Sequence, residues 1–263
     1  MGMGSLDDRV RMSDLLRPEI SYERPRGGGR AIFDLLGDLR GKRILDLGCG
    51  RGAYRLALER RGATWIGCDL SAGGCMIIAD GSSLPFPDGA FDGILSAAVL
   101  EHLPDPGAML DEARRVLRPG GRLFGYVAFL EPLHGMSYFH MTHLGLEYIL
   151  MRHGFRPTNV FPAENAVPVQ IERIMFPKRI PLAQPLSRTA SRGMTQCLLL
   201  LNRWGREVLT LLRRLPVETR RSERRQYRQL LALRHAAGLN FVAERSEVPE
   251  HLVAGYRALV KED

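Results

Sequence analysis

Residues Ile44–Ala53, with the sequence ILDLGCGRGA, decide the fold class of this chain. A short apolar run leads into three glycines at alternate positions, Gly48, Gly50 and Gly52, and a helix-forming stretch follows. This order predicts a strand, a tight turn and a helix. Such a turn brings backbone amides and the positive end of a helix close to a ligand, which suits a carboxylate or a phosphate. Glycine turns also occur for steric reasons alone, so the turn does not identify a ligand.

Outward from this turn, short apolar runs alternate with helical stretches, which is the pattern of βαβ units and a parallel sheet. We expect strands at Arg43–Leu47, Thr64–Leu70, Met76–Ala79, Phe91–Ala97, Arg122–Leu130, near Thr158–Pro162 and at Leu239–Glu244. We expect helices at Ala53–Arg61, from an Asp105 N-cap through Leu117, and at Thr142–His153. The predicted fold is α/β: a doubly wound, mostly parallel seven-stranded Rossmann-like sheet with a C-terminal helical insertion.

One connection is unusual. Only Ser71–Cys75 separates the second and third expected strands, which is too short for a crossover helix. Either an extended loop joins these strands or the third strand lies elsewhere. Pro119-Gly120-Gly121 is expected to close the helix that begins at Asp105, ahead of the fifth strand.

Three carboxylates stand at the ends of successive expected strands. Asp46, two residues before the first glycine, would repel a pyrophosphate and attract a cationic amino-acid group. Asp69 can accept hydrogen bonds from both hydroxyls of a ribose, although NAD-binding proteins use the same device. Asp80 can accept a hydrogen bond from an adenine amino group. Each carboxylate alone fits a solvated loop equally well, whereas the three together favour a binding site.

The stretch from Ile44 to Gly121 contains ILDLGCGRG, IGCDLS, ADGSSLPFPDGAFDGILSAAVLEHLPDPGAML and ARRVLRPGG in this order. It resembles the class I S-adenosylmethionine-dependent methyltransferases, in particular their type 11 branch. The shortened link between the second and third strands departs from the family pattern. The resemblance implies that the cofactor is S-adenosyl-L-methionine and that the chain is a methyltransferase.

The resemblance also implies roles for individual residues. The glycine loop would hold the methionine end of the cofactor through Asp46, Gly48, Cys49 and Gly50. Asp69 and Leu70 would hold the ribose, Asp80 and Gly81 would flank the adenine, and Ser96 and Ala97 would line the floor. Leu100, Glu101 and His102 would border the acceptor side, where Tyr138 is a further candidate for acceptor binding.

Methyl transfer is an in-line displacement, so the enzyme must chiefly align acceptor and methyl group and exclude water. An acidic oxygen or nitrogen acceptor also needs a base. The candidates lie in the His/Tyr-rich stretch Glu131–His143, which is similar to one in some type 11 members. His134 is the first candidate base and His140 the second, because an imidazole titrates near neutral pH. Alternatively, these histidines shape a loop without transferring protons.

The charge of the chain, +8 overall, is uneven along its length. Residues 173–236 hold fifteen arginines and lysines against three acidic residues, so the positive excess lies in this segment. Within it, residues 194–215 carry an apolar helical stripe with arginines beside it, and residues 222–237 predict a second helix. The segment is either a lid or homodimer element or a peripheral contact with anionic membrane; nucleic-acid binding is the least favoured alternative, since interleaved aromatics are lacking.

Composition excludes other classes. The cysteines, at 49, 68, 75 and 197, form no disulfide framework and no ligand-spaced cluster with histidine, so we expect reduced thiols and no metal. We find neither a signal peptide nor an apolar run long enough to span a bilayer, which predicts a cytoplasmic protein, with a peripheral membrane location as the variant. The expected organisation is an N-terminal segment 1–28, a cofactor-binding domain 29–166, a basic helical insertion 167–236 and a closing segment 237–263.

The sequence thus predicts methyl transfer to a small-molecule or lipid- or sugar-linked acceptor, with oxygen as the expected acceptor atom, as in natural-product, quinone or glycan biosynthesis. Two alternatives stay open. One is a non-catalytic S-adenosylmethionine-binding protein. The other is an NAD-dependent oxidoreductase, which Asp46 and the lack of an obvious Tyr-x-x-x-Lys pair disfavour.

Overall fold

The computed structural model describes residues 16–25, 31–130, 136–163, 193, 225–226, 229–230, 232–233, 236–248 and 253. The chain divides into two compact units. One comprises residues 1–18, 130–133 and 162–238, and the other comprises residues 19–129, 134–161 and 239–263. The second unit carries the strands and helices that form the candidate site.

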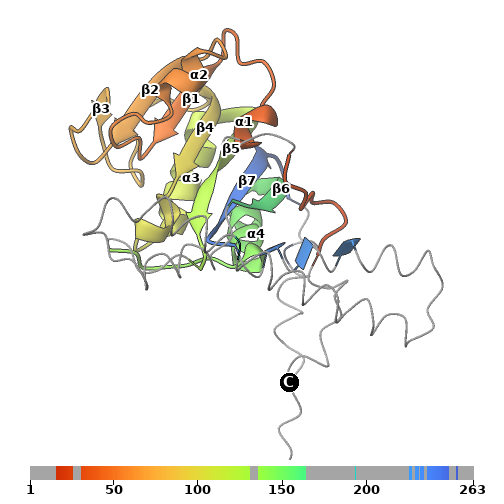
Figure 1. Ribbon diagram of the computed structural model, residues 1–263. Coiled ribbons are helices and arrows are strands. Elements are labelled where there is room, and N and C mark those ends of the chain that lie inside the picture. Colours follow the sequence, from red (N-terminus) through yellow and green to blue (C-terminus); the bar gives the residue numbers. More distant parts are fainter. Residues whose placement is uncertain are drawn as a thin grey trace, which may run out of the picture. The chain divides into compact units, whose positions relative to one another are not determined.

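A seven-stranded sheet has the strand order β3-β2-β1-β4-β5-β7-β6 (Figure 1). Its strands are β1 Arg43–Leu47, β2 Thr64–Asp69, β3 Ile77–Ile78, β4 Phe91–Ala97, β5 Leu117–Ala128, β6 Phe155–Pro162 and β7 Gly238–Arg245. The helices are α1 Ala31–Asp34, α2 Arg55–Glu59, the 3-10 helix η3 Leu100–His102, α3 Pro106–Val116 and α4 His143–Arg152. The predicted α/β sheet of seven strands is confirmed.

The sheet is mostly parallel. β1 pairs in parallel with both β2 and β4, β2 with β3, and β4 with β5. Between β6 and β7 the partners run in opposite order, since Arg156 binds Glu244 and Thr158 binds the Val242 carbonyl. This pair is therefore antiparallel. The carboxyl ends of β1, β2, β4 and β5 meet at one edge, where α/β sheets bind ligands.

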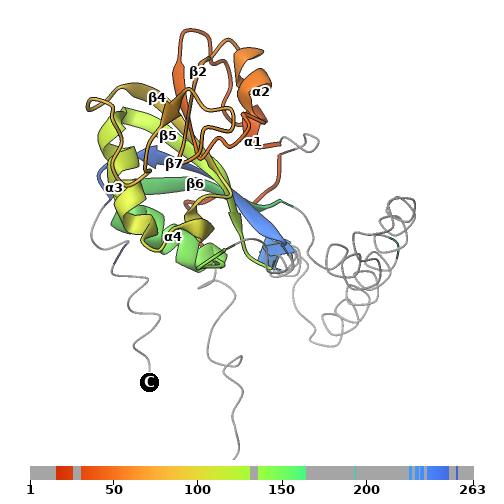
Figure 2. The same cartoon turned by 90° about the vertical axis from the view of Figure 1, so that its left-hand side faces the viewer.

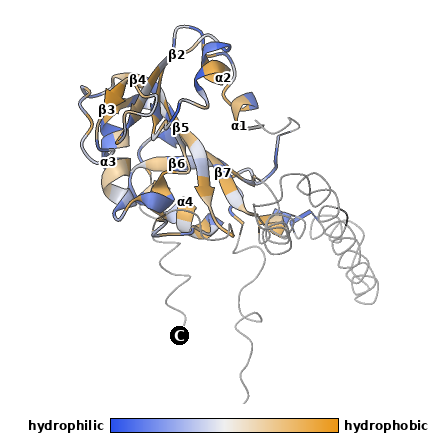
Figure 3. Cartoon of the chain, turned by 60° about the vertical axis from the view of Figure 1, so that its left-hand side comes forward, coloured by the Kyte–Doolittle hydropathy of each residue, from blue (hydrophilic) through white to orange (hydrophobic). Residues whose placement is uncertain are grey.

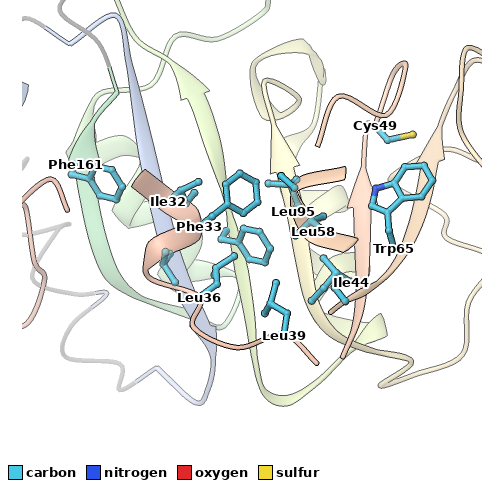
Figure 4. Close-up of a cluster of buried hydrophobic side chains, with 14 residues drawn as sticks. Ile32, Phe33, Leu36, Leu39, Ile44, Cys49, Leu58, Trp65, Leu95 and Phe161 are labelled. Carbon is cyan, nitrogen blue, oxygen red and sulfur yellow. The ribbon is translucent and has the colours of Figure 1, made fainter. Parts of the chain in front are cut away.

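Helices cover both faces of the sheet, as a doubly wound fold requires: α1 and α2 lie on one face, and α3 and α4 on the other (Figure 2). Both the strands and the helices carry hydrophobic and hydrophilic residues (Figure 3). A buried cluster joins α1 and α2 to the strands beneath them (Figure 4). It contains Ile32, Phe33, Leu36, Leu39, Ile44, Cys49, Ala57, Leu58, Ala63, Trp65, Leu95, Phe124, Phe161 and Val242.

The helix-start signals of the sequence are confirmed. Asp105 caps α3, because its Oδ1 accepts hydrogen bonds from the amides of Gly107 and Ala108 at 2.9 and 3.2 Å, with Pro106 in the first turn. Thr142 caps α4 in the same way. Helix α2 is shorter than the predicted Ala53–Arg61, since Gly52 has a φ of +72° and delays the start of the helix.

The expected position of Pro119-Gly120-Gly121 is wrong. These residues do not separate a helix from a strand but lie inside β5, which begins at Leu117. Phe91 pairs with Leu117 and Gly93 with Arg122, so β5 carries extra residues opposite β4. A Cβ atom on Gly121 would come within 2.7 Å of the Leu117 side chain, so only glycine fits this tight bulge.

The short link before β3 is an extended loop, and the third strand is in its predicted place. Ile77 and Ile78 pair in parallel with the end of β2, and the Met76 amide donates to the Gly67 carbonyl at 2.9 Å. A Cβ on Gly74 would come within 2.9 Å of Arg51 Cα, so this loop packs against the glycine turn. The shortened link therefore contacts the turn that the sequence assigns to the cofactor.

The basic segment and its two predicted helices lie almost wholly outside the described residues, so the lid, dimer and membrane readings stay predictions. No helix in the described part of the chain is long and apolar enough to cross a membrane. Within that part, no cluster of three or more His, Cys, Asp or Glu side chains could hold a metal ion.

Candidate functional site

The glycine turn after β1 is held against the end of β2. Gly48, Gly50 and Gly52 have φ values of +74°, +51° and +72°, in the left-handed region that favours glycine. The amides of Gly48 and Cys49 both donate to the Cys68 carbonyl, at 2.8 and 3.1 Å. A Cβ on Gly48 would overlap the side chain of Val99, which follows β4. The turn therefore packs directly against the connection that leads to η3.

This packing gives a matched pair of variants. Gly48→Ala combines an unfavourable φ with the overlap on Val99, whereas a Cβ on Gly50 meets nothing within 4 Å. We expect Gly48→Ala to lower the free energy of unfolding by about 3 kcal/mol and Gly50→Ala by about 1 kcal/mol. Urea unfolding measures both, and equal losses would contradict the packing of Gly48 on Val99.

Asp46 lies beneath the turn and is only 1% exposed. Its Oδ2 accepts a hydrogen bond from the indole Nε1–H of Trp65 at 2.9 Å. Burial raises the pKa of the Asp46 carboxyl to about 6, because the charged form loses its hydration; the Trp65 hydrogen bond opposes the shift and the negative charge of Asp69 adds to it. Asp46 is thus a buried carboxylate that a cationic ligand would stabilise.

Asp69, at the end of β2, braces the glycine turn. Its Oδ2 accepts from the Gly50 amide at 2.8 Å, and its Oδ1 accepts from the amide and the hydroxyl of Ser71, each at 3.0 Å. Burial would raise the pKa of Asp69, but the hydrogen bonds from Ser71 and Gly50 outweigh it and the net shift is downward. An ionised carboxylate oxygen has two lone pairs, so these bonds leave capacity for a ligand hydroxyl.

Asp80 and Gly81, predicted to flank the adenine, follow strand β3, and Leu70, predicted to hold the ribose, follows β2. Asp80 is exposed, and its Oδ1 accepts from the amide and hydroxyl of Ser82 at 2.8 Å, which lowers the pKa of Asp80. Gly81 faces α3, since a Cβ there would lie 3.3 Å from Met109 Cγ. Leu70 is 68% exposed. The exposed side chains of Leu70 and Asp80 are thus accessible to a ligand beside the ends of β2 and β3.

The end of β4 is tightly constrained. Ser96 is buried, and its Oγ has no hydrogen-bond partner among the described residues. Ala97 ends the strand, and Ala98 follows with a φ of +57°, the one non-glycine residue of the described chain in the left-handed region. The Ala98 amide donates to the Tyr126 carbonyl at 2.9 Å. Backbone strain of this kind clusters at functional sites.

Glu101 joins the predicted acceptor side to the sheet. Its carboxylate is fully buried, and Oε1 accepts from the Ala128 amide at the end of β5 at 3.2 Å. Its carbonyl accepts from the amides of Tyr138 and Phe139 at 2.7 and 3.2 Å. His102 Nδ1 lies 3.0 Å from the Met136 carbonyl. Tyr138, predicted with Glu101 and His102 to lie on the acceptor side, is therefore their neighbour.

The acceptor-side segment, Met136–Met141, has a fixed backbone and exposed side chains. Besides the bonds to Glu101, the Met141 amide donates to the Ala128 carbonyl at 2.9 Å. Met136, Tyr138 and Phe139 are nevertheless 84%, 59% and 43% exposed. His140 Nε2 lies 3.3 Å from Ser137 Oγ in the same segment. His134, the first candidate base, lies outside the described residues.

Sequence reasoning missed two features of this site. The first is Trp65, the hydrogen-bond partner of Asp46. Its only signal in the sequence was a tryptophan at the start of the second expected strand. The second is the left-handed backbone of Ala98, which cannot be inferred from an alanine in the sequence. Both features arise from contacts between strands that are distant in the chain.

Comparison with known proteins agrees with this geometry. Residues 45–125 match the family model described as a methyltransferase domain. The chain is 36% identical over 135 residues to an uncharacterized methyltransferase of Mycobacterium sp. (strain JLS), covering 45% of this chain and 54% of the relative. It is 35% identical over 131 residues to a demethylmenaquinone methyltransferase of Beutenbergia cavernae, covering 46% and 55%. The chain spans about half the length of the curated relatives it matches.

Among solved structures, the cyclase SpnF has 20% identity and a TM-score of 0.50, over 89% of this chain and 94% of that one. At this identity the likeness shows the fold alone. The family match and the glycine turn together define residues 45–125 as a class I S-adenosylmethionine-dependent methyltransferase domain of type 11.

Proposed function

We propose that the whole chain transfers a methyl group from S-adenosyl-L-methionine to a small-molecule or lipid- or sugar-linked acceptor. The observation that carries this proposal is the buried Asp46 carboxylate beneath the glycine turn. A cationic amino group at this position would be attracted, whereas a diphosphate would meet a negative charge. The Gly50 amide, which a phosphate would use, is already bound to Asp69.

In this proposal, Asp46, Gly48, Cys49 and Gly50 hold the methionine end of the cofactor. Asp69 and Leu70 hold the ribose, while Asp80 and Gly81 flank the adenine; Ser96 and Ala97 form the floor. When bound, the cofactor supplies an electrophilic methyl group on a sulfonium. The chain itself orients the acceptor, excludes water and holds the proton that an acidic acceptor would lose.

The acceptor side suits a molecule with an apolar or aromatic body. Met136, Tyr138 and Phe139 present exposed apolar surface on a backbone that Glu101 and Ala128 fix, so ordering them on a ligand has a small entropic cost. Three of the relatives are named demethylmenaquinone methyltransferases, which agrees with an acceptor of this type. We propose oxygen as the acceptor atom, since a hydroxyl on such a body needs the base that imidazoles supply.

Calorimetric titration and turnover test this function. We expect S-adenosylhomocysteine to bind and NADH not to bind. We expect incubation with S-adenosylmethionine and a panel of aromatic, quinone and lipid-linked hydroxyl acceptors to give products heavier by one methyl group, detected by mass. Binding of S-adenosylhomocysteine without any product would favour a non-catalytic binding protein, and NADH binding alone would overturn the proposal.

His140 and His134 are the proposed general bases. We expect the variant that removes the base to lower turnover by about a hundredfold at pH 7, with cofactor affinity unchanged. Measuring His134→Ala and His140→Ala separately distinguishes them. Full turnover in both would leave these histidines a structural role.

The basic segment, residues 173–236, is proposed to act as a lid or homodimer element or as a contact with anionic membrane. Flotation with anionic and with neutral liposomes, beside measurement of mass in solution, separates the two. We do not expect the basic segment to bind nucleic acid.

A further inference from the structure

Trp65 lies directly beneath the glycine turn, and its polar atom has a specific partner. The side chain is only 4% exposed, and its indole Nε1–H donates to Asp46 Oδ2 at 2.9 Å. Trp65 and Asp46 belong to neighbouring strands, since Ile44 pairs with Trp65 and Asp46 with Gly67. The two side chains therefore share one face of the sheet.

The space around the indole is shaped to hold it. A Cβ on Gly67 would overlap the indole and come within 2.9 Å of Cys49 Sγ, and a Cβ on Gly52 would touch the ring at 3.6 Å. The guanidinium carbon of Arg55 lies 5.1 Å from the ring centroid. The indole is thus confined by the turn, by Gly67 and by Arg55, so its N–H stays aimed at one oxygen of Asp46.

A purely structural role would not need that donor. A phenylalanine would also fill an apolar space between two glycines, but it would leave a buried carboxylate oxygen without this hydrogen bond. A donor to the charged form of a buried acid favours ionisation, which burial opposes. The indole therefore acts on the one group that the proposed function assigns to the cationic end of the cofactor.

We propose that Trp65 is a positioning residue for cofactor binding: its indole N–H holds the Asp46 carboxylate in the orientation and the charge state that the amino group of S-adenosylmethionine requires. This inference rests on the proposed function. The other ionisable groups around Asp46 are Asp69 at the end of β2, Cys49 in the turn and Arg55 across the indole. The Cys49 thiol stays protonated, because burial raises its pKa to about 12.

The test follows S-adenosylhomocysteine affinity by calorimetry between pH 5 and 7.5. In the unmodified protein the affinity should rise with pH through about 6, as Asp46 ionises. In Trp65→Phe we expect the midpoint to move up by roughly one pH unit and the affinity at pH 6 to fall about fivefold. Trp204→Phe, which alters the only other tryptophan, is the control and should match the unmodified protein. An equal loss of affinity at every pH, with an unmoved midpoint, would overturn the proposal.

A second measurement keeps the test open if Trp65→Phe does not fold. In Trp204→Phe labelled with nitrogen-15, the remaining indole N–H signal belongs to Trp65. We expect its chemical shift to titrate with a midpoint near pH 6 and to stop titrating when Asp46→Asn is added. A signal that does not respond to pH contradicts the proposal. Failure of the unmodified protein to bind S-adenosylhomocysteine at any pH would instead overturn the proposed function, while the indole titration would still report the hydrogen bond.

Discussion

Replacing Asp46 by asparagine is expected to weaken cofactor binding by about a hundredfold while leaving the folded protein as stable as before, or more so. Binding falls because the neutral asparagine cannot form an ion pair with the cationic amino group, and a charge-assisted hydrogen bond contributes about 1.5–3 kcal/mol. Stability does not fall, because the substitution removes a buried negative charge and keeps an oxygen to accept from Trp65.

The pH dependence of this stability gain has a definite sign. The pKa of Asp46 is raised in the folded protein to about 6, above its ordinary value, so the folded state binds more protons than the unfolded state between these pH values. Unmodified protein therefore loses stability as pH rises through this window. Asp46→Asn should gain up to about 3 kcal/mol at pH 7.5 and almost nothing at pH 3.5.

Calorimetry with S-adenosylhomocysteine and urea unfolding at both pH values measure these effects. Asp38→Asn is a suitable control, because it removes an exposed carboxylate, paired with Arg40, without touching the site. Unchanged affinity in Asp46→Asn would remove the observation on which the proposed function depends.

Replacing Gly125 by alanine is expected to lower the free energy of unfolding at least as much as Gly48→Ala, and more than Gly50→Ala. A Cβ on Gly125 would overlap the carbonyl oxygen of Ser96 on the neighbouring strand. The Ser96 oxygen belongs to the backbone in the centre of the sheet and the position of a Cβ is fixed by its own backbone, so no side-chain rotation relieves the overlap. We expect a loss of about 3 kcal/mol or more, at the upper end of overpacking effects.

Denaturant unfolding checks this second effect, with Gly145→Ala as the matched control. Gly145 lies in α4, where its Cβ would meet only Thr142 Oγ1 at 3.4 Å and where alanine is the better helix former. The control should therefore unfold at the same or a higher denaturant concentration. If Gly125→Ala were as stable as the control, β4 and β5 could not approach as closely as they do here.

The sequence alone predicted the features that depend on neighbours in the chain. Alternating apolar runs predicted the strands, and the capping signal at Asp105 predicted the start of α3, because N-caps bind amides only two or three residues away. The family motifs between Ile44 and Gly121 predicted a methyltransferase domain, which the family match confirms.

Other features depended on contacts between distant segments. The sequence placed Pro119-Gly120-Gly121 after a helix, because nothing local shows that Leu117 already pairs with Phe91. It predicted that Glu101 borders the acceptor, but not that the carboxylate is buried and bonds to the Ala128 amide, 27 residues further along. A side chain's burial and partner are properties of the packed sheet, so periodicity does not contain them.

What the sequence by itself determined is therefore the type of fold and the kind of ligand: a glycine turn between a strand and a helix, with aspartates at the strand ends. Only the tertiary structure decided how those aspartates behave. Packing removes water from Asp46 and places the Trp65 indole of the next strand within hydrogen-bond distance of it. Asp69 instead binds the Gly50 amide and so holds the turn. The physical reason is that the free energy of a charge depends on the groups and the water around it, and the folded structure determines both.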